Sequence, residues 1–431
     1  MLGATLVLTG VAPAQVQTNP LLSDMSTRAL TMGENSTVLH DQSNIWMFPS
    51  RINNYPDLAV AEFGYPDAYV LDDTIADDSP FQRLGVHWKF NEENPWVLAT
   101  YFHNRAPFDN TFLPIDLPLH GPMVDDEASY SNHRMDLFYG RVLGKNDFGF
   151  HFGYVHSSWK LEAPSALDEL AYSQYNIDVG LTMAEGALDL AAGVELYSFT
   201  DLETQTQDLF YVSADDAKSK GNHALYARCR YFYEYGPTYV FVPHAELALG
   251  KYEFQDYDWN SIDDINELDF TRKYTTFDVD VGVGMQYLPI TDVIAVLDAG
   301  VRTFSVRTET RHTALGNGSP VADTTLEYKE TYYALPYFKL GFEADVFQWL
   351  YIRLGGTTYW TKATRDNISG DYKVIEKYPY NQLYLGLGFN WKHLHVDCYT
   401  DPELFLNGLD FISGSGSDRM NFQMTVWYEM I

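Results

Sequence analysis

Two short stretches carry residues that could perform catalysis. The sequence "SNHRMD" places Ser131, His133 and Asp136 close together, and "YVHSSW" places His156 beside Ser157. A hydrolase needs its nucleophile and its base to meet in one fixed geometry. Neither spacing matches that of a barrel hydrolase, and adjacent residues on a β-strand face opposite sides. We therefore predict that the protein is not an enzyme and that it needs no cofactor.

Carboxylates are the second group that could do chemistry. The formal net charge is −31, from 28 Lys+Arg against 59 Asp+Glu. This balance argues against a nucleic-acid partner, which needs a basic surface, and fits a surface that attracts cations. Dense carboxylates could bind Ca²⁺ or Mg²⁺, but no EF-hand pattern is present, so we favour a solvated acidic rim without a metal site. The clusters are Asp67, Asp72, Asp73, Asp77 and Asp78; Asp125, Asp126 and Glu127; and Asp256, Asp258, Asp263, Asp264, Glu267 and Asp269.

The elements that carry these residues follow a period of two. In "TTFDVDVGVGMQYLP", residues 275–289, apolar side chains from Phe277 to Tyr287 alternate with Asp278, Asp280 and Gln286. Alternation of this kind indicates a strand with one apolar and one polar face. The apolar face could form the core of a soluble sandwich or meet lipid around a membrane barrel. A wet or ion-paired lumen accepts two carboxylates that a dry core would not, which favours the barrel.

The connections between strands favour the barrel as well. Short turns at 91–94, 145, 184–186, 235–237, 288–292, 347–349 and 391–393 alternate with long polar stretches near 64–81, 104–132, 160–170, 200–220, 255–269, 312–323, 364–377 and 400–419. Short periplasmic turns and long external loops are typical of outer-membrane barrels. Hairpin counting predicts roughly sixteen strands between about residues 55 and 431, with the weakest at 55–63 and 394–399. In the segment 326–346 we place Tyr332 and Ala334 on the lipid face, with Lys329 and Thr331 on the lumen face.

Composition and the N-terminus agree with export to the bacterial outer membrane. Aromatic residues make up 16% of the chain, including 32 Tyr, as barrel girdles require, and there are only two cysteines. Residues 1–14 end in Ala-Pro-Ala after an apolar stretch and resemble a signal peptide, although basic residues are missing at its start. We expect outer-membrane lipid as a partner, and barrel-assembly machinery during insertion.

Residues 28–64 are too polar and too interrupted to form a strand pair. Their motifs, and the stretch 83–109 that ends in Pro-Phe, resemble the FadL/TodX family of outer-membrane channels for long-chain fatty acids and hydrocarbons. The resemblance implies a fourteen-stranded barrel, and Phe48 stands where the family has Asn. It also implies that residues 15–54 form a plug, or hatch, within a barrel of residues 55–431. The matching or adjacent hatch residues are Arg28, Met32, Gly33, Asp41, Asn44, Trp46, Phe48, Pro49 and Ser50.

The predicted fold is thus an all-β, antiparallel transmembrane barrel of about 14–16 strands with an N-terminal plug. Alternation turns a set of charges into the lumen, where pairing would brace the wall: Asp278, Asp280, Asp298, Arg302, Lys339, Glu343 and Arg353. The favoured function is passive uptake of hydrophobic small molecules such as fatty acids or hydrocarbons. A general cation-preferring porin and a barrel that serves as a secretion or assembly scaffold are the alternatives.

Overall fold

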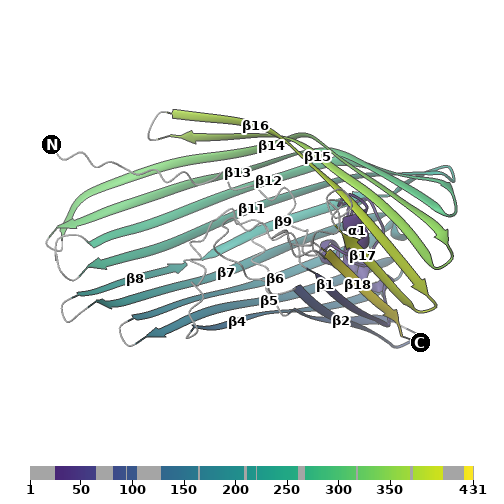
Figure 1. Ribbon diagram of the computed structural model, residues 1–431, viewed down its shortest axis with the longest axis horizontal. Helices are drawn as coiled ribbons and strands as arrows, with labels where there is room; N and C mark the ends of the chain where they lie inside the picture. Colours follow the sequence, from purple (N-terminus) through teal and green to yellow (C-terminus); the bar gives the residue numbers. More distant parts are fainter. Residues whose placement is uncertain are drawn as a thin grey trace, which may run out of the picture.

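The structure is a computed structural model, shown in Figure 1. It describes residues 25–64, 81–93, 95–103, 128–163, 166–207, 211–219, 221–260, 267–316, 319–368, 372–400 and 422–430. The predicted signal peptide and the acidic clusters at 67–78 and 125–127 lie outside these residues.

Most of the described chain is β-strand, as the period of two predicts. The strands are β1 (Leu58–Gly64), β2 (Phe81–Phe90), β3 (Trp96–His103), β4 (Ala128–Leu143), β5 (Asn146–Ala163), β6 (Ala166–Met183), β7 (Leu188–Gln207), β8 (Tyr211–Ser219), β9 (Asn222–Tyr231), β10 (Tyr233–Tyr235), β11 (Tyr239–Asn260), β12 (Glu267–Ile290), β13 (Val293–Gly316), β14 (Ser319–Phe347), β15 (Leu350–Asn367), β16 (Tyr372–Trp391), β17 (Leu394–Thr400) and β18 (Phe422–Glu429). The strands predicted with least support are present as β1 and β17.

All strands belong to one antiparallel sheet that closes on itself, because β1 pairs with β18 on one side and with β2 on the other. Strands β8 and β9 both lie between β7 and β11, and β10 continues β9 along β11. These three strands therefore share one position in the wall. The result is a sixteen-strand barrel, as hairpin counting predicts, rather than the fourteen strands that the family resemblance implies.

The outer surface of the barrel is apolar near the short turns. Exposed side chains there include Val281 at 48%, Leu340 at 56%, Leu354 at 53% and Leu383 at 61%. Exposed aromatic residues at the turns, such as Trp391, add the expected girdle. A closed barrel leaves no unpaired edge, and an apolar exterior is stable only against lipid. The protein is therefore a β-barrel of the bacterial outer membrane.

The short turns lie where they are predicted, but several predicted long loops are strand instead. Strand β5 reaches Ala163 and β6 begins at Ala166, and β7 and β8 fill most of 200–219. Strands likewise extend through most of 312–323 and 364–377. These segments protrude beyond the lipid, so both faces are polar and the alternation that marks a membrane strand disappears.

One register shift corrects a second prediction. The pairing of β14 with β15 shifts between Ala334 and Tyr337. On the C-terminal side of the shift Phe338 and Leu340 face lipid, as predicted. On the N-terminal side the parity reverses, so Tyr332 and Ala334 are buried on the inner face and Lys329 is exposed on the outer face. A β-bulge changes the face of all residues beyond it, and alternation alone does not reveal it.

Before the first strand the chain forms three short helical elements, α1 (Thr27–Thr31), α2 (Asn44–Met47) and η2 (Pro49–Asn54), and η3 (Ala184–Gly186) lies in a turn. No helix among the described residues is long and apolar enough to cross a membrane. Figure 1 shows α1 within the ring of strands, near the end where the C-terminus lies.

Candidate functional site

Residues Met25–Tyr55, here called the N-terminal segment, lie inside the barrel and contact its wall on several sides. The hydroxyl of Thr27 is 2.8 Å from that of Thr425 on β18, and the hydroxyl of Ser50 is 2.8 Å from that of Thr182 on β6. The side-chain amide of Gln286 on β12 donates to a carbonyl of the segment. Because β6, β12 and β18 are widely separated around the sheet, the segment bridges the interior.

Local hydrogen bonds shape the segment before it meets the wall. The Ser26 side chain caps α1 by accepting from the amide of Ala29 at 3.1 Å. Asp41 accepts from both the amide and the hydroxyl of Ser43, at 2.9 and 2.7 Å. Asn44 then accepts from the Asp41 amide at 3.1 Å. The predicted Asp41 and Asn44 thus form one turn that leads into α2.

Glycines on the inner face of the wall let the segment approach the strands closely. A Cβ atom on Gly355 would lie 2.2 Å from the Gly33 nitrogen, and one on Gly341 would lie 2.4 Å from the Met32 carbonyl oxygen. On the opposite side, a Cβ on Gly149 would lie 2.1 Å from the carbonyl carbon of Pro49. Such distances exclude any side chain, so these wall positions receive the backbone of the segment.

Gly33 itself must be glycine for two reasons. Its φ is +75°, a left-handed conformation that side chains disfavour, and a Cβ there would lie 2.2 Å from the Leu340 carbonyl oxygen. The predicted Met32-Gly33 motif is therefore a tight turn seated on β14 and β15. Met32 packs with Val38 and with Val296 of β13.

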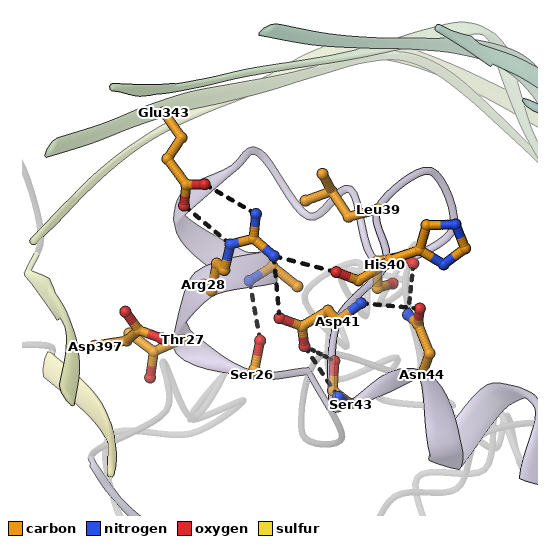
Figure 2. A network of polar contacts seen from close by, with 12 residues as sticks. Ser26, Thr27, Arg28, Leu39, His40, Asp41, Ser43, Asn44, Glu343 and Asp397 are labelled. Atoms are coloured by element: carbon orange, nitrogen blue, oxygen red, sulfur yellow. Dashed lines mark hydrogen bonds and ion pairs between the residues drawn. The ribbon is translucent and has the colours of Figure 1, made fainter. Parts of the chain in front are cut away.

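Arg28 links the segment to the wall on β14. Its guanidinium donates two hydrogen bonds of 2.9 Å to the carboxylate of Glu343. It also donates to the carbonyl of His40 at 3.1 Å and lies 3.9 Å from the Asp41 carboxylate (Figure 2). Burial alone would lower the pKa of Arg28, but the hydrogen bond and charge of Glu343 raise it above its ordinary value. Glu343 is shared with Arg353 of β15.

A second buried ion cluster holds the segment at β7 and β9. Asp189 accepts from Arg51 of the segment at 2.9 Å and from Arg230 of the wall at 2.7 Å. Arg230 also donates to the side-chain oxygen of Asn44 at 2.9 Å and to backbone carbonyls of the segment. Its guanidinium lies 4.6 Å from the centre of the Phe48 ring. Each buried charge therefore has an opposite charge or several acceptors, as stability requires.

Trp46 occupies a pocket of aromatic and cationic side chains from β2, β3 and β4. The guanidinium carbons of Arg83 and Arg134 lie 4.9 and 5.1 Å from its ring centre. Tyr101 and Phe138 meet the ring edge-on at 5.0 and 4.8 Å. Trp46 is 6% exposed and belongs to an apolar cluster formed by the segment and the wall.

The lumen charges predicted from alternation lie on the inner face, mostly in pairs. Arg302 donates to Asp278, the Tyr337 hydroxyl donates to Asp280 at 2.9 Å, and the His244 ring lies 2.9 Å from Asp298. Lys339 donates to the carbonyl of Glu34 at 3.2 Å, and Arg353 also pairs with Asp397. These pairs link strands of the wall to one another, and Lys339 links the wall to the segment.

The residues first considered for catalysis do not converge. Asp136 is fully buried on the inner face, where it binds Arg134 and His151, whereas His133 lies on the other face of the same strand. His156 instead approaches Ser173, at 3.0 Å. Within the described part of the chain, no group of three or more His, Cys, Asp or Glu could hold a metal ion.

His40, in the N-terminal segment, has a shifted pKa that a pH titration can reach. Its ring stacks on Phe232 at 4.0 Å between centroids and keeps an exposed face. Burial of the surrounding segment, then the charges of Arg230 and Arg51, lower its pKa to about 4. Because water reaches the exposed face, we expect only a modest energetic effect.

Sequence reasoning missed two important residues. Glu34 is buried and accepts hydrogen bonds from the hydroxyls of Tyr359, at 2.9 Å, and Tyr384. Asp189 is buried and binds Arg51, which the sequence analysis does not predict. The carboxylate directly after Gly33 is the one signal in the sequence that points to Glu34.

Comparisons with known proteins find only distant similarity. No protein-family model and no curated protein matches the chain. The toluene transporter TbuX of Ralstonia pickettii is similar in structure, with 8% sequence identity, 94% of this chain and 97% of that chain covered, and a TM-score of 0.40. The ferric yersiniabactin uptake receptor FyuA of Yersinia pestis has 7% sequence identity and a TM-score of 0.39, with 87% of this chain and 81% of that chain covered.

CdiB from Acinetobacter baumannii has 11% sequence identity and a TM-score of 0.35, with 86% of this chain and 59% of that chain covered. The chain therefore spans less than two thirds of that protein. Similarity at this level carries no argument about substrate.

Proposed function

We propose that the protein is a passive outer-membrane channel for hydrophobic small molecules, such as fatty acids or hydrocarbons, and that the N-terminal segment is its plug. The main support is the position of that segment, which spans the interior and is bonded to widely separated strands. A segment bound on several sides would hinder free diffusion of water and ions. Uptake would then be slow and saturable.

Apolar and aromatic side chains on the inner face support a hydrophobic substrate. Phe304, Val306, Tyr332 and Ala363 form one cluster, and Ala334, Tyr337 and Tyr359 form another. Both lie on strands β13 to β15, and Tyr359 of the second cluster also donates to Glu34 of the segment. The lumen of a general porin is polar and filled with water. An interior with aromatic clusters would instead offer contacts to an apolar ligand.

The net charge of −31 is the observation that favours the alternative, a general cation-preferring porin. Such a porin requires an open path past the N-terminal segment. A scaffold role in secretion or assembly requires neither a path nor a ligand. Ion conductance and ligand binding by the same purified protein would separate these three functions.

The test is deletion of residues 28–50 from the full chain. We expect a large rise in single-channel conductance in planar bilayers and weaker binding of a fluorescent fatty acid. Barrel integrity is checked by heat-dependent electrophoretic mobility. Unchanged conductance in a folded deletion variant would show that the segment is not a plug and would remove the main support for this function.

A further inference from the structure

The outer face of strands β13 to β16 carries basic residues in an unfavourable arrangement. Arg307 lies directly opposite Lys329 on the neighbouring strand, and Lys362 lies directly opposite Lys377. All four side chains are exposed. Like charges directly opposite one another destabilise a sheet unless an anion lies between them. Basic residues are also less than half as numerous as acidic ones in this chain, so composition does not explain two such pairs.

The register of the barrel brings these residues to the outside. Arg307 has the same parity along β13 as Val301, which is 45% exposed on the lipid face. Lys329 is turned outward only because β14 shifts register between Ala334 and Tyr337. Without that shift, Lys329 would share the inner face with Lys339. The shift therefore adds a cation to the exterior of the barrel.

Carboxylates neutralise this patch only in part. Arg307 pairs with Glu327 at 2.7 Å, and Glu309 lies opposite Glu327 on the neighbouring strand. Asp366 lies directly opposite Lys329, but its carboxylate pairs with Lys373 at 3.7 Å. Lys362 lies 5.9 Å from the ring centre of Tyr333, a contact that leaves its charge in place. Among the described residues, neither Lys329 nor Lys377 has an acidic partner within ion-pairing distance. The patch therefore keeps excess positive charge.

The patch lies at the boundary between lipid and water. On β15 the outward positions run from Ile352 and Leu354 to Trp360, which is 53% exposed, and the next outward residue is Lys362. Lys362 is about a dozen residues beyond the short turn at the start of β15, and a tilted strand needs about 9–11 residues to cross the membrane. An exposed tryptophan typically marks the interface. The basic patch is thus level with the headgroups of the outer leaflet.

We propose that Arg307, Lys329, Lys362 and Lys377 form a binding site for the phosphate-bearing headgroup of an outer-leaflet glycolipid. Lysine and arginine bind phosphate through charge-assisted hydrogen bonds. A lipid headgroup is preferred to a free anion because exposed apolar side chains lie on the same outer face between the patch and the short turns and would contact the acyl chains. They are Leu335, Trp360, Leu354 and Leu383. The site is on the exterior of the barrel and does not depend on the proposed transport function.

The test uses the full-length protein in detergent micelles, titrated with a glycolipid that carries phosphate monoesters on its sugars. The same lipid after enzymatic removal of phosphate, and inorganic phosphate alone, serve as comparison ligands. The variants are K362Q/K377Q and R307Q/K329Q. The matched control is K145Q/K392Q, which removes two exposed lysines at the short-turn end of the barrel. Heat-dependent mobility verifies that each variant is folded.

We expect each site variant to lower affinity for the phosphorylated lipid roughly tenfold or more, since a basic residue near an anionic lipid surface contributes measurably to binding. The control should retain wild-type affinity, and the dephosphorylated lipid should bind weakly to all proteins. Equal affinity for both lipids would overturn the proposal. An equal loss in the control and the site variants, or inorganic phosphate binding as tightly as the lipid, would do so as well.

Discussion

Replacement of Gly33 by alanine is the sharpest perturbation of the N-terminal segment. An L-residue in the left-handed conformation costs about 1–2 kcal/mol. The new Cβ would also lie 2.2 Å from the Leu340 carbonyl oxygen, where ordinary contact begins at 3.4 Å. Relief of this clash requires the turn to move away from β14 by about an ångström, and this displaces Glu34 from Tyr359 and Tyr384.

The two tyrosine hydrogen bonds to the Glu34 carboxylate contribute about 1.5–3 kcal/mol each. With the backbone term, G33A should destabilise docking of the turn by about 4–8 kcal/mol. The barrel should stay intact, because its strand pairing does not involve this turn. The segment would remain tethered through Arg28 and Arg51, so conductance should rise above wild type but stay below that of the deletion variant.

Gly144 provides a matched control. Its φ is +68°, close to that of Gly33, but a Cβ at Gly144 would meet no atom within 4 Å. G144A therefore carries the backbone strain without the clash. Single-channel conductance of both variants in planar bilayers is the measurement. Equal conductance of G33A and G144A would show that the close contact of the Gly33 turn with β14 does not hold the segment in place, and would refute the prediction.

Three further outcomes follow from the same contacts. D189N leaves two buried guanidiniums without their carboxylate and should destabilise docking of the segment by about 3–5 kcal/mol, seen as faster proteolysis within residues 28–55. The control E185Q removes a carboxylate from the exposed pair of Lys145 and Glu185 and should change stability by less than about 1 kcal/mol. Because the pKa of His40 is lowered to about 4 from an ordinary 6.5, docking should be complete above pH 6.5 and weaken as pH falls towards 4. Weaker docking should raise conductance, and H40Q should remove this pH dependence. The prediction is contradicted if H40Q shows the same conductance–pH profile as the wild type. Finally, any conductance should be cation-selective at low salt and less so at high salt, as expected from the charge of −31; anion selectivity in bilayer recordings would contradict this.

The strands and their two faces were predictable because side chains alternate strictly along a strand. Phe277 and Val281 face lipid while Asp278 and Asp280 face the interior, as alternation predicts. The extended ends of β5 to β16 were not predictable as strands. Beyond the lipid both faces are polar, so no hydrophobic signal distinguishes a strand from a loop.

The candidate site was predictable only as a list of residues. Sequence motifs drew attention to Arg28, Gly33 and Trp46, but not to the partners that hold them.

The sequence by itself determined the barrel class and the inner or outer face of most strand residues, because both depend on local periodicity. Tertiary structure alone decided that Arg28 meets Glu343 and that Arg51 meets Asp189, since these partners are more than a hundred residues apart. It also decided which wall glycines receive the segment and that Lys329 faces outward. Closure and register set these contacts, and the bulge in β14 reverses the face of the residues beyond it without any mark in the hydrophobic pattern.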